Sequence, residues 1–157
     1  MILVDTSVWI DHFRSGVDAL ANALESDKVM THPSVVGELA CGHLHNRAEV
    51  LRLLDELPQA PVGNELAVRV FIERHRLMGR GIGYIDAHLL AAATLAAGGV
   101  LWTRDKRLAS VAAELHVGAN EWTNVNANDK VADVRASLRS PSSSEPGAAG
   151  AHRPSRP

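Results

Sequence analysis

Four carboxylates in this sequence lie at junctions between apolar segments and helices. Asp5 and Asp105 each follow a short apolar run, Asp86 opens a long apolar helix, and Glu38 lies about one turn inside another predicted helix. In an open α/β sheet, the carboxyl ends of the parallel strands all face one crevice. We therefore expect these four side chains to meet at one edge of a sheet, although they are far apart in the sequence.

Carboxylates that meet in a partly dry site repel one another, so they must take up protons or bind a cation. Oxygen ligands suit a hard ion such as Mg²⁺ or Mn²⁺. Such an ion can lower the pKa of a bound water or offset the charge that develops on a phosphodiester. The sequence thus predicts a metal-dependent site that hydrolyses phosphodiesters without a covalent intermediate, with Asp5, Glu38, Asp86 and Asp105 as its metal ligands and catalytic groups.

Each of these acids also has an ordinary structural role open to it. Asp5 precedes Thr6 and can cap a helix, Asp86 can favour the positive end of its own helix dipole, and Asp105 can lie in a turn between basic residues. The expected position of the acids at one edge of the sheet favours the shared site over separate roles.

Short hydroxyl side chains next to two of the acids are candidate supporting groups. Thr6 and Ser7 follow Asp5, and Thr103 lies two residues before Asp105. Their hydroxyls are suited to contact a metal-bound water or a phosphate oxygen, and helix capping is their alternative role.

Short apolar runs alternate with helical patterns along most of the chain. Strands are predicted at residues 2–4, 28–31 and 100–103, with a possible last strand at 116–117. Amphipathic segments 49–57 and 65–77, separated by a proline- and glycine-containing stretch, are predicted to form a helical hairpin. The fold class expected is α/β: an α/β/α sandwich with a short, mostly parallel sheet flanked by helices.

The chain of 157 residues has the length of one domain. We expect a folded domain over residues 1–123 and a C-terminal extension over 124–157, with a possible short helix at 129–139. Residues 140–157 are rich in Ser, Pro, Gly and Ala, which predicts a disordered tail.

Composition excludes several classes of protein. The formal net charge of −2 argues against a strongly basic, non-specific nucleic-acid binder. No segment reaches the roughly 20 apolar residues needed to span a bilayer, and the apolar start is too short for a signal peptide, so a cytoplasmic location without membrane association is expected. The lone Cys41 excludes an internal disulfide and is expected to be buried on a helix.

Histidines offer weaker candidates. His43 and His45 form a His-x-His pair, but on a helix these positions point to different sides and cannot readily share one zinc ion. A partly exposed helix end is the expected setting. His12 and His88 lie nearer the predicted groove, as minor candidates for RNA contact or proton donation.

Four ordered motifs together resemble PIN-domain ribonucleases, specifically the VapC-type toxins of bacterial toxin–antitoxin pairs. The motifs are ILVDTSVWI around Asp5, VVGEL around Glu38, GRGIGYIDAHLLA around Asp86 and LWTRDKRL around Asp105, and they cover about residues 1–120. The resemblance implies a PIN-like fold and an acidic quartet that binds Mg²⁺ or Mn²⁺. Thr103 matches the hydroxyl residue that commonly precedes the fourth acid.

The resemblance also implies partners. Such proteins cleave single-stranded or looped RNA, are neutralised by a cognate VapB-type antitoxin, and usually form homodimers. Basic residues near the predicted site give a physical reason for an RNA substrate, because they can pair with backbone phosphates beside otherwise repulsive carboxylates. The candidate RNA contacts are Arg74, Arg76, Arg80, Arg104, Lys106 and Arg107.

Other functions remain open at this point. A phosphatase with an aspartate nucleophile normally needs a second acid two residues after the first, where this chain has Ser7. A phosphoacceptor receiver domain would carry paired acids before its acceptor strand. A non-catalytic module could use an acidic groove to bind a basic peptide, although binding alone does not require four converging carboxylates.

Overall fold

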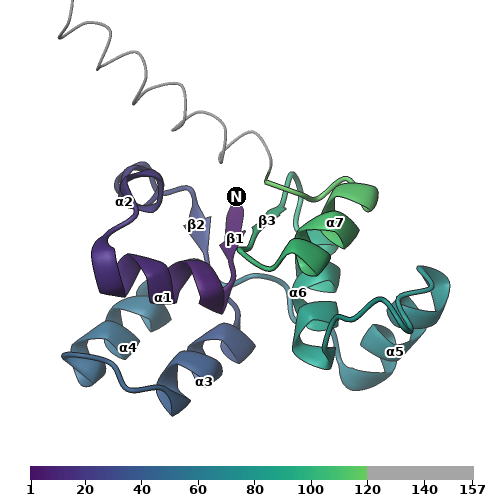
Figure 1. Cartoon of the computed structure of the whole chain (residues 1–157), viewed down its shortest axis with the longest axis horizontal. Coiled ribbons are helices and arrows are strands. Elements are labelled where there is room, and N and C mark those ends of the chain that lie inside the picture. The colour runs from purple at the N-terminus through teal and green to yellow at the C-terminus, as the bar shows by residue number, and fades with distance from the viewer. Residues whose placement is uncertain (120–157) are drawn as a thin grey trace, which may run out of the picture.

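The computed structural model describes residues 1–119 and contains a small parallel sheet surrounded by helices (Figure 1). Strands β1 (Ile2–Val4), β2 (Val29–Met30) and β3 (Val100–Trp102) are arranged in the order β2-β1-β3. Ile2 of β1 is opposite both Val29 and Val100. The three residues of β1 are almost completely buried, as expected for a central strand covered on both faces.

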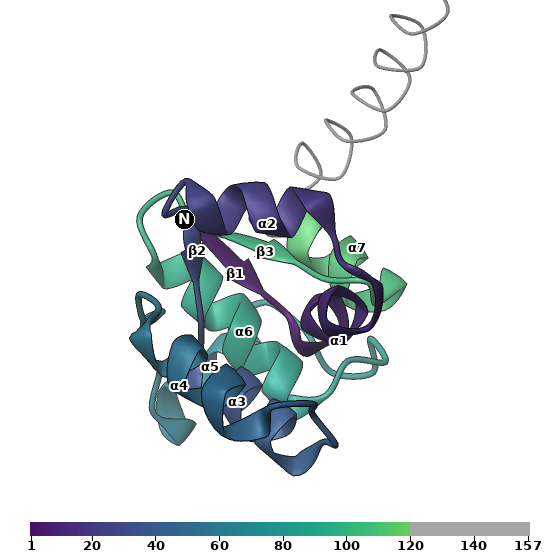
Figure 2. The ribbon, with the colours of Figure 1, turned by 90° about the vertical axis from the view of Figure 1, so that its left-hand side faces the viewer.

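Seven helices within residues 1–119 connect and cover the strands. In chain order they are α1 (Thr6–Ser15), α2 (Asp18–Glu25), α3 (Pro33–Cys41), α4 (Arg47–Glu56), α5 (Glu65–Arg74), α6 (Tyr84–Leu95) and α7 (Lys106–Glu114). Figure 2 shows α6 against one face of the sheet and α2 against the other. The predicted α/β/α sandwich with a parallel sheet is confirmed.

Helix α6 is the most buried helix because its sequence is apolar on nearly every side. Ala87, Leu89, Leu90, Ala92 and Ala93 are each at most 2% exposed. The helix packs on β1 and β3, and α5 packs on its outer side. This packing fixes the N-terminal end of α6, where Asp86 lies, relative to the ends of the two strands.

The prediction of a helical hairpin at residues 49–57 and 65–77 is wrong. Helix α4 packs against α3, whereas α5 packs against α6, and the two lie on opposite sides of the molecule in Figure 1. Residues 58–60 separate them by running beside β2: the Thr31 N–H donates to Pro58 O (2.9 Å) and the Ala60 N–H to Thr31 O (2.7 Å). The breaker stretch therefore extends the sheet edge instead of forming a tight turn.

The opposite edge of the sheet is extended in the same way. Leu101 N–H donates to Val117 O (2.6 Å), and Ala119 N–H donates to Leu101 O (3.1 Å). The bridge at Gly118 is parallel, which agrees with the last strand expected near residues 116–117.

Residues 120–157 lie outside the described part of the chain, and with them most of the extension at 124–157 and the helix expected at 129–139. The division into a domain at 1–123 and an extension therefore stays a prediction. Within residues 1–119, no helix is both long and apolar enough to cross a membrane.

Candidate active site

Asp5 lies at the carboxyl end of the central strand and is only 7% exposed. Its N–H donates to Trp102 O (2.9 Å), which places the ends of β1 and β3 side by side. Its Oδ2 accepts two hydroxyl bonds, from Ser7 Oγ (2.5 Å) and Thr103 Oγ1 (2.8 Å). Although Asp5 occupies the N-cap position of α1, its side chain makes no capping bond, so the alternative role as a helix cap is wrong.

The two hydroxyls that contact Asp5 also hold the turn after β3. Arg104 N–H donates to Ser7 Oγ (3.0 Å), and Asp105 N–H donates to Thr103 Oγ1 (3.0 Å). Ser7 and Thr103 therefore connect the start of α1 to the segment that carries the fourth acid. The bonds from Ser7 and Thr103 fix the Asp5 carboxylate through Oδ2, and Oδ1 takes no part in them.

Asp86 lies in the first turn of α6 and its Oδ2 accepts from the Gly83 N–H (2.7 Å). Burial is the main reason that the pKa of Asp86 is raised, and the Gly83 hydrogen bond partly opposes the shift. Repulsion by Asp5, Asp105 and Glu38 raises the pKa further. The pKa of Asp86 thus responds to all three of the other predicted acids.

The loop before Asp86 is packed against a basic side chain. Gly81 has φ +73°, and a Cβ built there would lie 2.9 Å from Arg107 Cδ. A side chain at this position would therefore both strain the backbone and displace Arg107. Glycine at position 81 lets the loop pass beneath the first turn of α7 on its way to Asp86.

Asp105 has a structural role as the N-cap of α7, in addition to its predicted role in the site. Its Oδ1 accepts from the N–H groups of Arg107 (2.7 Å) and Leu108 (3.0 Å), which caps α7. Its Oδ2 takes no part in this cap. A helix cap of this kind fixes the carboxylate in position at the same sheet edge as Asp5.

Glu38 is exposed on α3, and its Oε2 accepts from Thr6 Oγ1 (2.6 Å). This bond links α3 to the first residue of α1, directly after Asp5. The hydroxyl of Thr6 therefore positions the Glu38 carboxylate at the mouth of the site.

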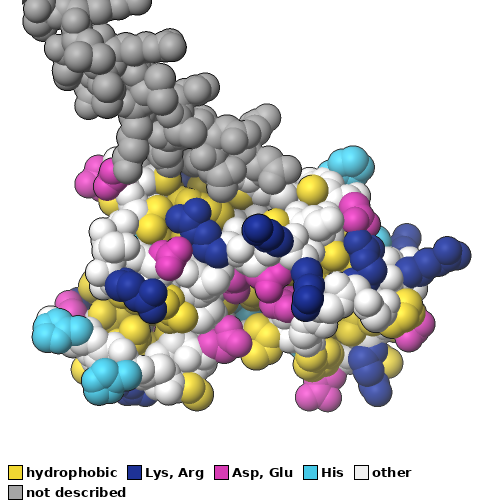
Figure 3. Space-filling model, in the orientation of Figure 1, with side chains coloured by type: hydrophobic (Ala, Val, Ile, Leu, Met, Phe, Trp, Pro, Cys, Tyr) yellow, Lys and Arg dark blue, Asp and Glu magenta, His cyan; other side chains and the backbone are white. Residues whose placement is uncertain are grey.

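The four acids form one electrostatic group without being closely packed. Figure 3 shows acidic side chains at the centre of this face with basic side chains near them. Within residues 1–119, no three His, Cys, Asp or Glu side chains are placed to hold a metal ion directly by themselves. Water molecules would therefore have to complete the ligand set of any ion bound here.

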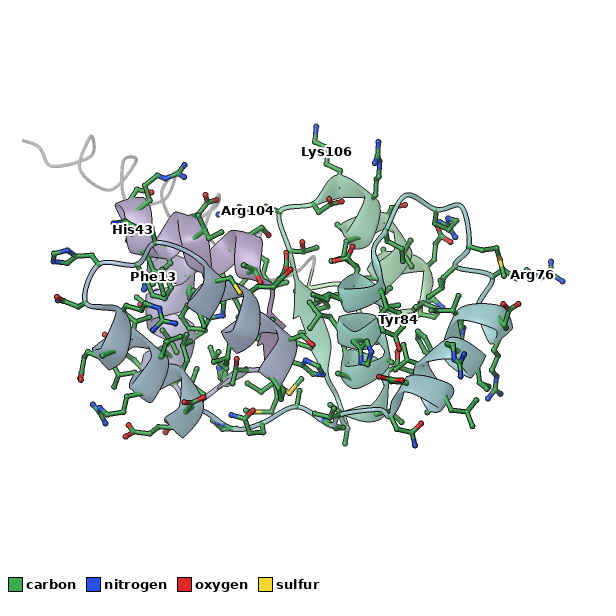
Figure 4. The ribbon with its side chains drawn as sticks, turned by 90° about the horizontal axis from the view of Figure 1, so that it is seen from below. Phe13, His43, Arg76, Tyr84, Arg104 and Lys106 are labelled. Carbon is green, nitrogen blue, oxygen red and sulfur yellow. The ribbon has the colours of Figure 1, made fainter. Side chains whose placement is uncertain are left out.

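The six basic residues predicted to contact RNA do not form a single patch. Arg104 Nε pairs with Asp11 Oδ2 (3.2 Å), and Arg80 Nη2 pairs with Glu114 Oε1 (2.6 Å). Figure 4 shows Arg104 and Lys106 near the centre of the molecule and Arg76 at its far end. Arg74 lies at the C-terminal end of α5, beside a separate small cavity against α6.

Several side chains are placed differently from expectation. Cys41 is exposed and not buried, because it ends α3 on the outer side. His43 and His45 lie in the loop after α3 and not on a helix. His12 Nδ1 accepts from the Val17 N–H (3.1 Å), which places it at the end of α1.

One residue near the site was missed by the sequence analysis. His32 is 1% exposed, and its Nδ1 accepts from the Ser34 N–H (3.1 Å) to cap α3. Burial lowers the pKa of His32, and His88 nearby lowers it further. The position before Pro33, a common first helical residue, was the available signal, but His is not among the usual capping residues.

The fold and this arrangement of acids match a known protein family. Residues 2–114 match the PIN domain. The chain is also 47% identical over 121 residues to Ribonuclease VapC32 of Mycobacterium tuberculosis, in strains CDC 1551 / Oshkosh and ATCC 25618 / H37Rv, and the match spans 77% of this chain and 98% of each relative. The chain therefore belongs to the PIN-domain family, among its VapC-type ribonucleases, which confirms the resemblance seen in the four sequence motifs.

Proposed function

We propose that this protein is a metal-dependent endoribonuclease that hydrolyses RNA phosphodiester bonds and acts as a toxin. The observation that carries the proposal is the hydrogen-bond network around Asp5 at the end of β1: Ser7 and Thr103 tie its carboxylate to the segment of Asp105, and Thr6 ties Glu38 beside it. Asp86 lies near enough for the other three acids to raise its pKa. The ionised form of Asp86 is destabilised by burial and by these three carboxylates unless a cation offsets their charge. Similarity to proteins named Ribonuclease VapC32 supports RNA as the substrate.

The donor set fits Mg²⁺ or Mn²⁺. All four predicted ligands are carboxylates, and Mg²⁺ is commonly bound by one or two carboxylates while it keeps several waters. Asp5 and Asp86 would hold the ion, with Glu38 and Asp105 completing the site. Bound there, the ion would supply a more acidic water and offset charge on the phosphodiester.

The protein's own groups have separate tasks in this proposal. Ser7 and Thr103 hold the Asp5 carboxylate in one orientation through their hydroxyl bonds. Thr6 holds Glu38, and the cap of α7 holds Asp105. Glu38 and Asp105 are both exposed, so either carboxylate is accessible to orient the attacking water and accept its proton.

Basic residues beside the acids would hold the RNA backbone. Arg104, Lys106 and Arg107 follow β3 directly and lie next to Asp105. Arg80 is paired with Glu114 of α7, Arg76 lies at the far end of the molecule in Figure 4, and Arg74 lines the cavity between α5 and α6. Their position beside Asp105 makes the first group the better set of phosphate contacts, with Arg104 exchanging its exposed pair with Asp11 for a phosphate. The other three residues would serve only a longer RNA.

A toxin of this kind is controlled by a partner. The VapC name of the relatives supports neutralisation by a cognate VapB-type antitoxin. The cytoplasm is the location that we propose for both partners. Expression of the chain alone should arrest bacterial growth, and co-expression of the antitoxin should restore it.

The test of the proposed activity is metal removal. Purified protein should cleave labelled single-stranded RNA in Mg²⁺ or Mn²⁺, and chelation with EDTA should lower the rate by at least about 100-fold, reversibly, because the ion supplies several kcal/mol of charge stabilisation. Cleavage products would be measured on denaturing gels. Arg69→Gln, an exposed change on α5, serves as a control that should cleave normally. Cleavage that is indifferent to EDTA would contradict metal dependence, and binding without cleavage would favour the acidic-groove module.

We also propose a homodimer formed through the outer faces of α5 and α6. Leu66, Val70 and Leu95 are 58–63% exposed there, a large apolar area to leave in water. A cavity of about 260 Å³ between the two helices gives this face a concave centre, with Val70 among its lining residues. A second copy of the chain would cover these side chains.

Val70→Glu should therefore weaken the dimer by about 30-fold or more, since a charge would be buried in an apolar contact. Sedimentation equilibrium over a range of concentrations measures the effect. Leu53→Glu changes a similarly exposed apolar residue on α4 and should leave the dimer intact. An unchanged dimer in Val70→Glu would place the interface elsewhere.

A further inference from the structure

A second pocket opens beside the acidic group, between α1 and the loop that joins α3 to α4. Its volume is about 540 Å³, within the range of small-ligand sites. Glu38 is part of its wall, and Glu38 is also bonded to Thr6 next to Asp5. The pocket therefore borders the site that would hold the scissile phosphate, with Glu38 shared between them.

The floor of this pocket offers a flat aromatic ring. Phe13 is 39% exposed, and its ring stacks on buried Trp9 with centroids 5.6 Å apart and planes at 23°. Trp9 thus supports one side of the ring and leaves another part of it open to the pocket. Ile10, 42% exposed, extends this apolar surface. A supported ring can stack with a nucleobase at little cost in side-chain entropy.

Hydrogen-bond donors surround the ring. Arg14 of α1 and the two histidines of the loop, His43 and His45, line the same pocket, and Glu38 is its one acidic lining residue. Guanidinium and imidazole N–H groups are donors suited to phosphate oxygens. Figure 4 shows Phe13 and His43 at the same end of the molecule, and Figure 3 shows apolar surface bordered by basic and histidine side chains there.

We propose that this pocket binds the nucleotide next to the scissile bond, with its base stacked on Phe13 and its phosphate held by Arg14 and the two histidines. The inference rests on the proposed ribonuclease function and extends it to the binding of the substrate beside the cut. An apolar ring with a rim of phosphate donors, opening at the acidic site, fits a nucleotide better than an apolar peptide. This pocket thus adds affinity for the RNA beside the cut, whichever base is stacked there.

The test measures binding separately from cleavage. A fluorescein-labelled, single-stranded oligoribonucleotide of mixed sequence is titrated in Mg²⁺ against full-length protein carrying Asp86→Asn, and affinity is read by anisotropy. Phe13→Leu keeps an apolar side chain without the flat ring and should weaken binding by about 10-fold, as expected for one lost stacking contact. Val62→Ala, an exposed apolar change outside the pocket, should have no effect.

Arg14→Gln adds a readout that a purely structural role would not produce. The slope of log affinity against log salt concentration should become shallower by about 0.7, the value for one lost phosphate contact on a single strand. Arg69→Gln, which lies outside the pocket, should leave RNA affinity unchanged. In the active protein, Phe13→Leu should raise KM with little change in kcat, because it removes a binding contact that lies outside the acidic site.

The outcomes separate this inference from the proposed function. The pocket assignment alone would be overturned if the wild type cleaves RNA but Phe13→Leu and Arg14→Gln bind RNA as tightly as their control variants. Absence of both cleavage and binding with the pocket intact would overturn the proposed function and the pocket with it. Variants that keep RNA affinity but escape neutralisation by a co-expressed antitoxin would assign the pocket to the protein partner and also overturn the inference.

Discussion

Asp86→Asn is expected to abolish RNA cleavage and to raise the thermal stability of the metal-free protein. The rate should fall by about 1,000-fold, equivalent to roughly 4 kcal/mol of lost transition-state stabilisation, because the carboxylate would no longer help to hold the divalent ion. Stability should rise because ionised Asp86 is partly buried and is repelled by Asp5, Asp105 and Glu38. The amide keeps an oxygen that can accept from the Gly83 N–H.

The pH dependence of this stability follows from the direction of the pKa shift. The pKa of Asp86 is higher in the folded protein than in the unfolded chain, so the folded state binds the proton more tightly. The contribution of the group to stability is fully present below its unfolded pKa, near pH 3.9. This contribution is lost as the pH rises through the pKa that Asp86 has in the folded protein. The advantage of Asp86→Asn should therefore be largest near neutral pH and vanish in acid.

Thermal melts in EDTA from pH 3 to pH 8 measure this difference directly. Saturating Mg²⁺ should raise the melting temperature of the wild type and should raise that of the variant much less. At a Mg²⁺ concentration of 100 times the dissociation constant, the free energy of unfolding of the wild type should increase by about 2.7 kcal/mol. Asp55→Asn, an exposed acid on α4, is the matched control and should change neither cleavage nor the Mg²⁺ response. A variant that loses activity but is less stable than the wild type at neutral pH would argue against the repulsive group.

Asp5→Asn is expected to reduce cleavage by a similar factor, about 1,000-fold, for a different structural reason. In the native site one oxygen of Asp5 accepts two hydroxyl bonds, from Ser7 and Thr103. An amide has a single acceptor oxygen, so it can either satisfy these hydroxyls or face the ion, but not both. The variant should therefore fold normally but bind Mg²⁺ only weakly.

The cost of Asp5→Asn to stability should be small compared with that of Asp5→Leu. Leucine would leave both hydroxyls without their acceptor in a part-buried place, at about 1–3 kcal/mol for each unsatisfied group. Urea unfolding of both variants, together with Mg²⁺ titration by calorimetry, separates the two effects. Asp11→Asn breaks only the exposed pair with Arg104 and should retain activity within a few-fold. Full activity in Asp5→Asn would remove Asp5 from the metal site.

Much of the fold could be predicted because its signals are local. The apolar residues 2–4 and 100–102 read as buried strands, and the alternation with helices identified a parallel sheet. The helical hairpin was wrong because Pro58 and Ala60 bond to Thr31 across the chain, and no local pattern encodes that contact. Cys41 was misplaced for a related reason, since helical periodicity gives a helix face but not the neighbour that covers it.

The position of the acids was easier to predict than their surroundings. Strand ends and helix starts mark Asp5, Asp86 and Asp105 in the sequence itself. The bond between Thr103 and Asp5 joins residues 98 positions apart, and the bond between Thr6 and Glu38 joins residues 32 apart. Both depend on the order β2-β1-β3, which sequence spacing does not specify. The sequence therefore identified the hydroxyl residues as candidates but did not indicate which carboxylates they bond.

The register of the central strand β1 determines both the packing of the core and the position of Asp5. Asp5 follows a strand that is paired on both sides, and its own N–H continues the ladder to Trp102. A shift of one residue would put the apolar Val4 in the place of Asp5 and would move the carboxylate away from the Thr103 hydroxyl. Inserting or deleting a single residue in this short stretch would therefore disturb both the core and the acidic site, because residues 2–4 are buried and Asp5 follows them directly.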